Sequence, residues 1–245
     1  MARRLESRQR LAPDVDRKHY ARADTPEECI WLFAVTLLSP IFWVLAPVYG
    51  YLQWYKNQDR IKSYGEYRWL LQALQDTYPT RRLALNAPAH TGALDALLKT
   101  VPEALLVQTH RDPVESVSSL NSLFYSLHSA VTDRPDARRT AKANLGLQEH
   151  EIALNLAARD AHPGRVFDVY YEKLVADPIG TVRGIYDHYG LAWRGAFEER
   201  LGAYVRENSK GRHGPHRYAA TDFGQTDGAI AKRFASYRQR FGFMS

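Results

Sequence analysis

The stretch that decides the fold is "VQTHRDPVESVSSL", which runs from Val107 to Leu120. An apolar run ends in the polar sequence His-Arg-Asp-Pro, and apolar residues at helical spacing follow at once. This order predicts a strand, a turn, and a helix that begins at Pro113 with Asp112 as its N-cap. The free N–H groups and positive dipole end of such a helix favour an anion. Because Arg111 stands in the same turn with a fork suited to phosphate, the stretch predicts a phosphate site.

The segments around this stretch alternate between short apolar runs and helical patterns. Residues 82–86, 104–110 and 164–174 are predicted as strands, and 92–102 as the helix between the first two. Further helices are predicted within 25–78 and over 113–128, 136–161, 178–191, 194–208 and 227–243. Strand, helix and strand at this spacing indicate a parallel βαβ unit. The sequence therefore predicts an α/β fold, a central parallel sheet flanked by helices, with ligand chemistry at the carboxyl ends of the strands.

Length and composition narrow the class of protein. The chain has 245 residues and a formal net charge of +6, with no long block of Lys and Arg, so no nucleic-acid partner is expected. Cys29 is the only cysteine, which excludes an internal disulfide and a cysteine-based metal site and favours a reducing cytoplasm. The histidines lack the spacing of a helical metal pair, so no metal is expected. We predict a charged segment at 1–24 and one domain at 25–245.

The stretch from Cys29 to Trp54 carries no charge and is long enough to span a bilayer. Pro40 and Pro47 would each interrupt a helix, which leaves pieces of the length found in buried helices. We therefore favour a buried core over residues 25–78 that also forms the helical wall of an apolar pocket, beside an α/β core at 79–245. A transmembrane segment, and contact with a membrane surface or a greasy substrate, remain as less favoured alternatives.

Three segments carry a family resemblance when they are taken together. They are "LVQTHRDPVESVSSL", "VYYEKLVADPIGTV" and "SKGRHGPHRYAATDFG" with the "RFASYRQRFGF" that follows it. In this order they resemble the bacterial branch of the sulfotransferases that use 3′-phosphoadenosine 5′-phosphosulfate (PAPS). The resemblance runs from about residue 25 to the C-terminus, and it implies the P-loop-related α/β fold of that family and sulfuryl transfer from PAPS to a hydroxyl.

The resemblance also implies a set of donor-binding residues. They are Arg111, Ser119, Tyr171, Lys210, Gly211 and Arg212. Arg111 and Ser119 match the pair that grips the 3′-phosphate, and "KGRHG" (210–214) matches the loop that closes over it. Tyr171 falls where an aromatic side chain lies near adenine. The spacing is physically reasonable, because a hydroxyl two helical turns after the strand end can face back toward Arg111.

Two departures from the family's pattern concern the chemistry. The family's Pro-Arg-Ser-Gly-Thr-Thr-type loop, which cradles the 5′-phosphosulfate, does not occur in this sequence. In "LALNAPAHTG", Asn86 stands where the family has the lysine near the bridging oxygen, while His90 remains as a candidate base or a structural histidine. One interpretation is a truncated gene or fragment, and the other is a fold put to another use. The substitution at Asn86 favours the second, since truncation does not explain an internal change.

Three functions follow as hypotheses. The first is sulfuryl transfer from PAPS to a hydroxyl of a small apolar metabolite, with His90 and Asn86 at the reacting centre. The second is a PAPS-independent enzyme that performs acid–base or cyclisation chemistry on an apolar substrate with the same two residues. The third is a non-catalytic module that binds 3′-phosphoadenosine 5′-phosphate (PAP). The aromatic residues of 42–55 make a greasy acceptor plausible. The oligomeric state and the pathway do not follow from the sequence.

Overall fold

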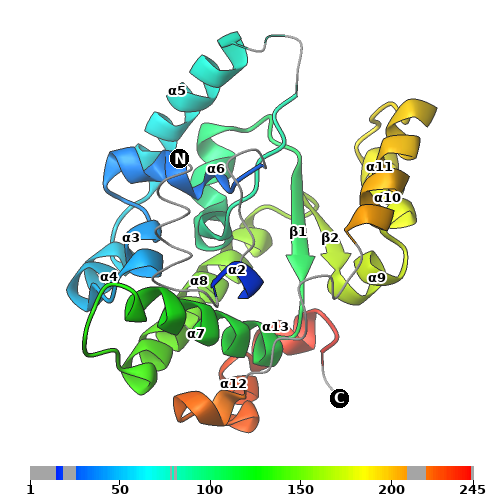
Figure 1. Ribbon diagram of the computed structural model, residues 1–245. Helices are drawn as coiled ribbons and strands as arrows, with labels where there is room; N and C mark the ends of the chain where they lie inside the picture. The colour runs from blue at the N-terminus through cyan, green and yellow to red at the C-terminus, as the bar shows by residue number, and fades with distance from the viewer. Residues whose placement is uncertain (1–14, 19–25, 78, 80–81, 209–218, 244–245) are drawn as a thin grey trace.

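The computed structural model describes residues 15–18, 26–77, 79, 82–208 and 219–243 (Figure 1). In these residues helices surround a small parallel sheet, which confirms the predicted α/β fold. The sheet consists of β1 (Leu106–His110) and β2 (Val166–Tyr170), paired in register from Leu106 with Val166 to His110 with Tyr170. Parallel strands need a crossover, and here α7 (Pro113–Ser129) and α8 (Ala137–Ala161) supply it.

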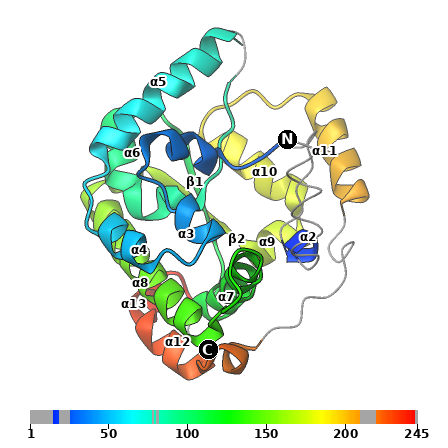
Figure 2. The ribbon, with the colours of Figure 1, turned by 60° about the vertical axis from the view of Figure 1, so that its left-hand side comes forward.

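Helices pack on both faces of this sheet. On one face, Leu106 and Val166 pack against apolar residues of α6 (Leu94–Thr100) and α8. On the other face, the Phe167 ring lies 4.8 Å from the ring of His188, the last residue of α10 (Pro178–His188). Figures 1 and 2 show α10 and α11 (Gly195–Glu207) on the side of the molecule opposite α3, α4 and α5. The two strands therefore have helices on both of their faces.

The first of the three predicted strands is wrong. Residues 82–87 form no regular secondary structure and lead into the short helix η2 (Pro88–Ala93). The Asn86 carbonyl accepts the N–H of Cys29 at 2.8 Å, so the backbone here bonds to another helix and not to β1. Pro88, which has no N–H to give to a ladder, follows two residues later. The last predicted strand is real but shorter, because Tyr171–Ala176 forms the helix α9.

Residues 26–77 are largely helical, as predicted for 25–78, and a further short helix, α2 (Val15–Lys18), lies in the segment before them, where none was predicted. The other elements are η1 (Cys29–Thr36), α3 (Ile41–Leu45), α4 (Tyr49–Lys56) and α5 (Ile61–Thr77). Pro40 and Pro47 fall at the breaks between η1, α3 and α4. None of the helices in the described residues combines the length and the apolar character needed to cross a bilayer. Phe33 of η1 stacks on Tyr67 of α5 with ring centroids 4.4 Å apart, which ties the two helices together.

A buried ion pair fixes this helical layer to α8. Arg60, just before α5, binds Glu151 of α8 through two hydrogen bonds of 2.7 and 2.5 Å, and both side chains are less than a tenth exposed. Gly92 of η2 lies directly against the pair, since a Cβ there would stand 2.0 Å from a Glu151 oxygen. The pair therefore holds α5, η2 and α8 in one arrangement, and a side chain at position 92 would disturb it.

The C-terminal residues close the carboxyl end of the sheet. They form η3 (Ala220–Phe223), α12 (Asp227–Arg233) and α13 (Ala235–Arg240). In Figure 1, α13 lies at the arrowhead of β1, beside the start of α7. An ion pair of 3.1 Å between Arg238 of α13 and Asp112 confirms this contact. The predicted helix over 227–243 is thus two short helices, and the second of them reaches the site.

Candidate functional site

A cleft of about 500 Å³ runs along β1 to its carboxyl end. Its walls come from β1, from the segment that leads into η2, and from α7, α9 and α13. Four residues that the sequence predicted for the site line it together: Asn86, His90, Arg111 and Tyr171. Asn86 and His90 come from the segment at the start of η2, whereas Arg111 and Tyr171 directly follow β1 and β2. The sheet therefore assembles a single cleft from residues that the sequence separates.

Arg111 and Tyr171 meet at the carboxyl ends of the two strands. The Arg111 guanidinium lies over the Tyr171 ring, with Cζ 4.6 Å from the ring centroid. The same guanidinium binds the Glu115 carboxylate of α7 at 2.7 and 2.8 Å. The Arg111 side chain is 36% exposed, so solvent and ligands can reach it. A cation beside an aromatic ring suits a phosphate joined to a flat base, but an incoming anion competes with Glu115.

The start of α7 differs from the prediction in one respect. Asp112 is the N-cap, as predicted, and its carboxylate accepts the N–H of Val114 at 3.0 Å. Its carbonyl accepts the N–H groups of Glu115 and Ser116, both at 3.1 Å. The prediction of free N–H groups for an anion is therefore wrong here, because Asp112 satisfies the first turn. The anion prediction rests on Arg111.

The remaining donor residues are only partly within the described chain. Ser119 lies on α7, two turns beyond Arg111, and is half-buried. The serine of α7 that lines the cleft is Ser116. Lys210, Gly211 and Arg212 lie outside the described residues. Their roles stay predictions.

His90, in η2, lines the same cleft and lies in an aromatic enclosure. Its Nδ1 is 2.8 Å from the Tyr64 hydroxyl, and its Nε2 is 3.4 Å from the Cys29 sulfur. The rings of Phe33 and Tyr67 approach it at 5.8 and 5.7 Å. Burial lowers the pKa of His90 to about 4, because the enclosure offers no charge to stabilise the imidazolium. The ring is neutral at pH 7, and both of its nitrogens face protein groups.

Asn86 connects this side of the cleft to η1. The residue is exposed and lines the cleft. Its carbonyl accepts the N–H of Cys29 and, at 3.3 Å, also the thiol of Cys29. Burial raises the pKa of that thiol, so the sulfur is protonated at neutral pH. This side of the cleft is therefore held by hydrogen bonds between neutral groups.

A polar group beneath the strand ends was missed by sequence reasoning. His110, fully buried, binds the Asp168 carboxylate through Nε2 at 2.8 Å and the Tyr237 hydroxyl through Nδ1 at 2.7 Å. Its ring stacks on Phe241 with centroids 4.0 Å apart. Burial lowers the pKa of His110, and the Asp168 carboxylate opposes that shift. These contacts tie the end of β1 and the middle of β2 to α13.

Hydrogen bonds made by side chains continue from Asp168 along β1 to Thr91, next to His90. Arg159 of α8 donates to Asp168 at 2.8 Å and to Gln108 at 3.0 Å. Gln108 donates to Asn155 at 3.2 Å, and Asn155 donates to the carbonyl of Thr91 at 2.9 Å. One signal in the sequence could have revealed this chain of hydrogen bonds. Gln108 and His110 are polar residues two apart on a strand, so their side chains share a face of the sheet.

The charges at the strand ends are balanced within the protein. Three arginines meet carboxylates there, in the pairs Arg111–Glu115, Arg159–Asp168 and Arg238–Asp112. Arg159 and Arg238 are 10% and 15% exposed, while Arg111 is the most accessible of the three. Of these pairs, Arg111–Glu115 is therefore the one that a ligand can most readily open.

Comparisons with known proteins show the family and the fold. The family model described as "Sulfotransferase family" matches residues 1–195. The structure is similar to sulfotransferase STF1 of Mycobacterium tuberculosis, with a TM-score of 0.77 and 30% identity over 89% of this chain and 57% of that one. It is also similar in fold to STF9 of Mycobacterium avium, with a TM-score of 0.82 and 24% identity over 96% of this chain and 63% of that one.

Curated relatives match a shorter part. They are the omega-hydroxy-beta-dihydromenaquinone-9 sulfotransferases Stf3 of Mycobacterium bovis and Mycobacterium tuberculosis, each 26% identical over 147 residues. The match covers 58% of this chain, which spans 38% of the length of these relatives. Since the family model matches most of the chain and the solved structures share its fold, the chain belongs to the sulfotransferase family.

Proposed function

We propose that the chain binds a PAPS-type donor at the carboxyl ends of its strands and takes part in sulfuryl transfer to a hydroxyl of a small apolar molecule. The observation that carries the proposal is one cleft that is lined both by Arg111 beside Tyr171 and by His90. Because the chain spans 38% of its curated relatives, the activity of a whole protein is part of the proposal. A cytoplasmic location stays a prediction that rests on the single cysteine.

The residues at the strand ends fit the 3′ half of such a donor. Arg111 supplies a guanidinium for the 3′-phosphate, and Tyr171 supplies a ring against which adenine can stack. Ser119 and the segment of Lys210, Gly211 and Arg212 would add contacts to the same phosphate. Glu115 must give way when the phosphate arrives, so binding is weaker than the cation alone suggests.

The sequence offers fewer residues that could bind the 5′-phosphosulfate half of the donor. The Pro-Arg-Ser-Gly-Thr-Thr-type loop does not occur in the 245 residues, and Asn86 brings a neutral amide where the family has lysine. Removing one charged or well-placed donor from a reacting centre costs about 3 kcal/mol, roughly a hundredfold in rate. Slow turnover by this chain alone is therefore part of the proposal.

On the acceptor side, His90 is proposed as the group that receives the hydroxyl proton. In the transfer the acceptor oxygen forms a bond to sulfur, the bond from sulfur to the phosphate oxygen breaks, and the acceptor loses its proton. If His90 donates from Nδ1 to Tyr64, whose hydroxyl is 3.5 Å from the Ala89 carbonyl, Nε2 is left to accept that proton. The contact of Nε2 with Cys29 is long, at 3.4 Å, and an acceptor hydroxyl can replace it.

The class of acceptor follows from the cleft and from the relatives. Leu85, Leu94 and Leu97 are among the apolar residues that line the cleft near His90. The curated relatives are named for a hydroxylated dihydromenaquinone as acceptor. A hydroxyl on an apolar molecule is therefore the substrate class that we propose for this chain.

Calorimetric titration with PAP tests the donor site. We expect micromolar binding by the 245-residue chain, a loss of at least a hundredfold in Arg111→Ala, and no change in Arg134→Ala, an exposed arginine between α7 and α8. No binding at millimolar PAP would refute the proposal. If binding is confirmed, transfer of radiolabelled sulfate to phenols and hydroxylated prenols tests the acceptor class, with His90→Ala as the inactive reference.

A second candidate is a module that binds the donor without turnover, and Asn86 favours it. The replacement Asn86→Lys separates the two functions, because it restores a cation at an exposed position of the cleft. A rise of tenfold or more in transfer rate would favour a slow transferase. PAP binding without transfer in either chain would favour the module.

A further inference from the structure

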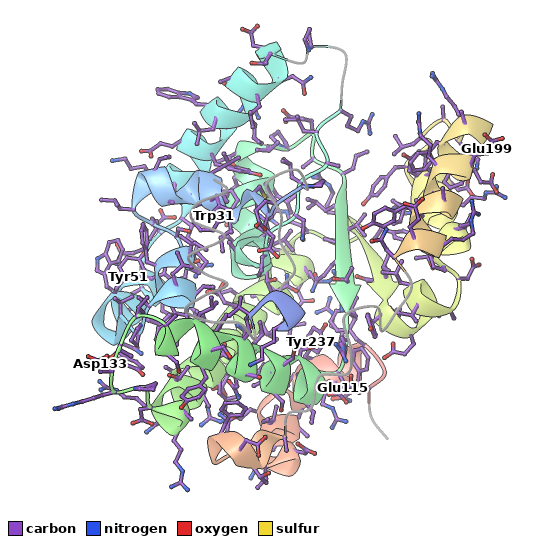
Figure 3. The ribbon with its side chains drawn as sticks, in the orientation of Figure 1. Trp31, Tyr51, Glu115, Asp133, Glu199 and Tyr237 are labelled. Carbon is purple, nitrogen blue, oxygen red and sulfur yellow. The ribbon has the colours of Figure 1, made fainter. Side chains whose placement is uncertain are left out.

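The helical layer exposes apolar side chains that the cleft does not use. We call the apolar face the surface formed by Trp31, Val35, Leu37, Leu45, Val48 and Trp54. Val35 and Leu37 are 70% and 67% exposed, and Trp31 and Trp54 are 43% and 47% exposed. Single exposed apolar residues are ordinary, but a cluster of large ones marks a surface that binds something apolar. Figure 3 labels Trp31 and Tyr51 on this side of the molecule.

Hydrogen bonds and ring contacts join the parts of the apolar face. The Tyr51 hydroxyl accepts the N–H of Ser39 at 3.0 Å and lies 2.9 Å from the Leu37 carbonyl, so α4 is tied to the turn after η1. The Tyr51 ring lies 5.4 Å from Trp54 and 5.5 Å from Phe42. The turn at Leu37 and the outer side of α4 therefore form one surface.

The apolar face is also built on a packed base. The same segments of the sequence also contain Phe33, Trp43 and Leu52, whose side chains are 2%, 0% and 0% exposed and pack in the core. At the tip, Leu37 has a φ of 57°, a left-handed conformation that suits glycine far better than leucine. The fold thus exposes a leucine at a strained turn, and because the side chain is 67% exposed, its transfer to an apolar environment is favourable.

The distribution of charged residues indicates what kind of apolar partner the apolar face contacts. Residues 29–55 contain no charged side chain. Basic groups beside this stretch include Lys56, at the end of α4, and Arg139, whose guanidinium lies 4.0 Å from the Tyr49 ring centroid. Proteins that lie in the interface of a bilayer present a surface of this kind: apolar side chains with tryptophan and tyrosine among them, and basic residues at the edge of the surface. The net charge of +6 favours anionic lipids.

We propose that the apolar face docks on the surface of a lipid bilayer that contains anionic lipid. The helix η1 connects this surface to the cleft, because Glu28, directly before η1, lines the cleft and the turn at Leu37 ends the helix. An apolar acceptor in the bilayer would then lie close to the cleft mouth. This last step rests on the proposed function, whereas docking itself does not.

Vesicle co-sedimentation without any donor tests the docking. The probe is vesicles of phosphatidylcholine and phosphatidylglycerol in a ratio of about 7:3, chosen for their anionic surface. We expect the chain to bind them, and the double variant Val35→Glu with Leu37→Glu to lose at least tenfold in partition coefficient. Trp69→Ser is the matched control: Trp69 is 74% exposed on α5, on the helix side opposite Tyr64 and Tyr67, which pack toward η1.

The outcomes are separable. Circular dichroism and PAP titration of the double variant show whether it folds, and the single variants Val35→Ser and Leu37→Ser, expected to lose a few-fold each, replace it if it does not. The proposal is overturned if the wild type does not bind vesicles at low salt, or if Trp69→Ser loses as much as the double variant. It is also overturned if sedimentation equilibrium shows self-association through this face and vesicles capture none of the chain. Vesicle binding without PAP binding would refute the proposed function alone.

Discussion

The part of the cleft around His90, here called the neutral end, and the part around Arg111, the charged end, are held together by different interactions. Around His90 the groups are neutral and enclosed, with Tyr64 and Cys29 on the ring nitrogens and aromatic rings beside them. Around Arg111 the groups are charged and accessible, and Glu115 balances the guanidinium. The first end is fixed by packing, so perturbing it changes stability. The second is fixed by exchangeable ion pairs, so perturbing it changes affinity. Three predictions test this difference.

The largest effect is expected where the neutral end is anchored. Replacing Glu151 with glutamine leaves the Arg60 guanidinium buried without its carboxylate. Breaking a buried ion pair from one side costs about 3–5 kcal/mol. Urea denaturation should show this loss in the free energy of unfolding of Glu151→Gln.

The matched control is Glu149→Gln, which removes the exposed pair with Arg233 from the same helix. We expect it to cost about 1 kcal/mol or less, because exposed pairs are screened by water. Equal losses in the two variants would contradict the idea that α8 holds the His90 end through a buried charge.

A smaller effect concerns pH. The pKa of His90 is about 4 in the folded chain and 6.5 as the reference value for the unfolded chain. The unfolded state therefore binds the proton first, so the stabilisation is complete above pH 6.5 and is lost as the pH falls toward 4. Between pH 7 and pH 5 this group should cost about 2 kcal/mol of unfolding free energy.

Urea midpoints at the two pH values measure that loss in the wild type and in His90→Gln. Burial also lowers the pKa values of His110 and His128, so both proteins lose stability in acid. The wild type should lose more. An identical pH dependence in the variant would mean that His90 is not enclosed as described.

The smallest effect is expected at the charged end. Replacing Glu115 with glutamine removes the carboxylate that competes for Arg111. Exposed ion pairs contribute about 0.5–1 kcal/mol, so PAP should bind roughly two- to fivefold more tightly to Glu115→Gln. Titration calorimetry measures the gain, and Glu103→Gln, which opens the exposed pair with Arg68, is the control with no expected change. Weaker binding by Glu115→Gln would show that the carboxylate positions Arg111 and does not compete.

Local signals in the sequence predicted much of the fold. Asp112 and Pro113 mark the start of α7, and the helix predicted over 136–161 is α8 at 137–161. These features depend on neighbouring residues alone, through capping and helical spacing. The strand predicted at 82–86 failed because a short apolar run does not distinguish a strand from an extended segment that packs on another helix.

The contacts within the site depend on residues far apart and were not predictable in detail. The resemblance placed Arg111 and Tyr171 in one site, and the structure adds that Glu115 occupies the guanidinium. His90 was identified as a candidate base, but its partners Cys29 and Tyr64 lie 61 and 26 residues away. The sequence holds no local signal for such pairs, since only the packed helical layer brings them together.

The long crossover between the strands has a consequence for folding kinetics. Leu106 pairs with Val166, and α7 and α8 occupy the sequence between them. Contacts between these helices close short loops and form quickly, whereas pairing of the strands closes the whole crossover and is slow. Arg111 and Tyr171 follow the two strands and meet only when the strands have paired. Recovery of PAP binding during refolding should therefore lag behind the recovery of helical circular dichroism.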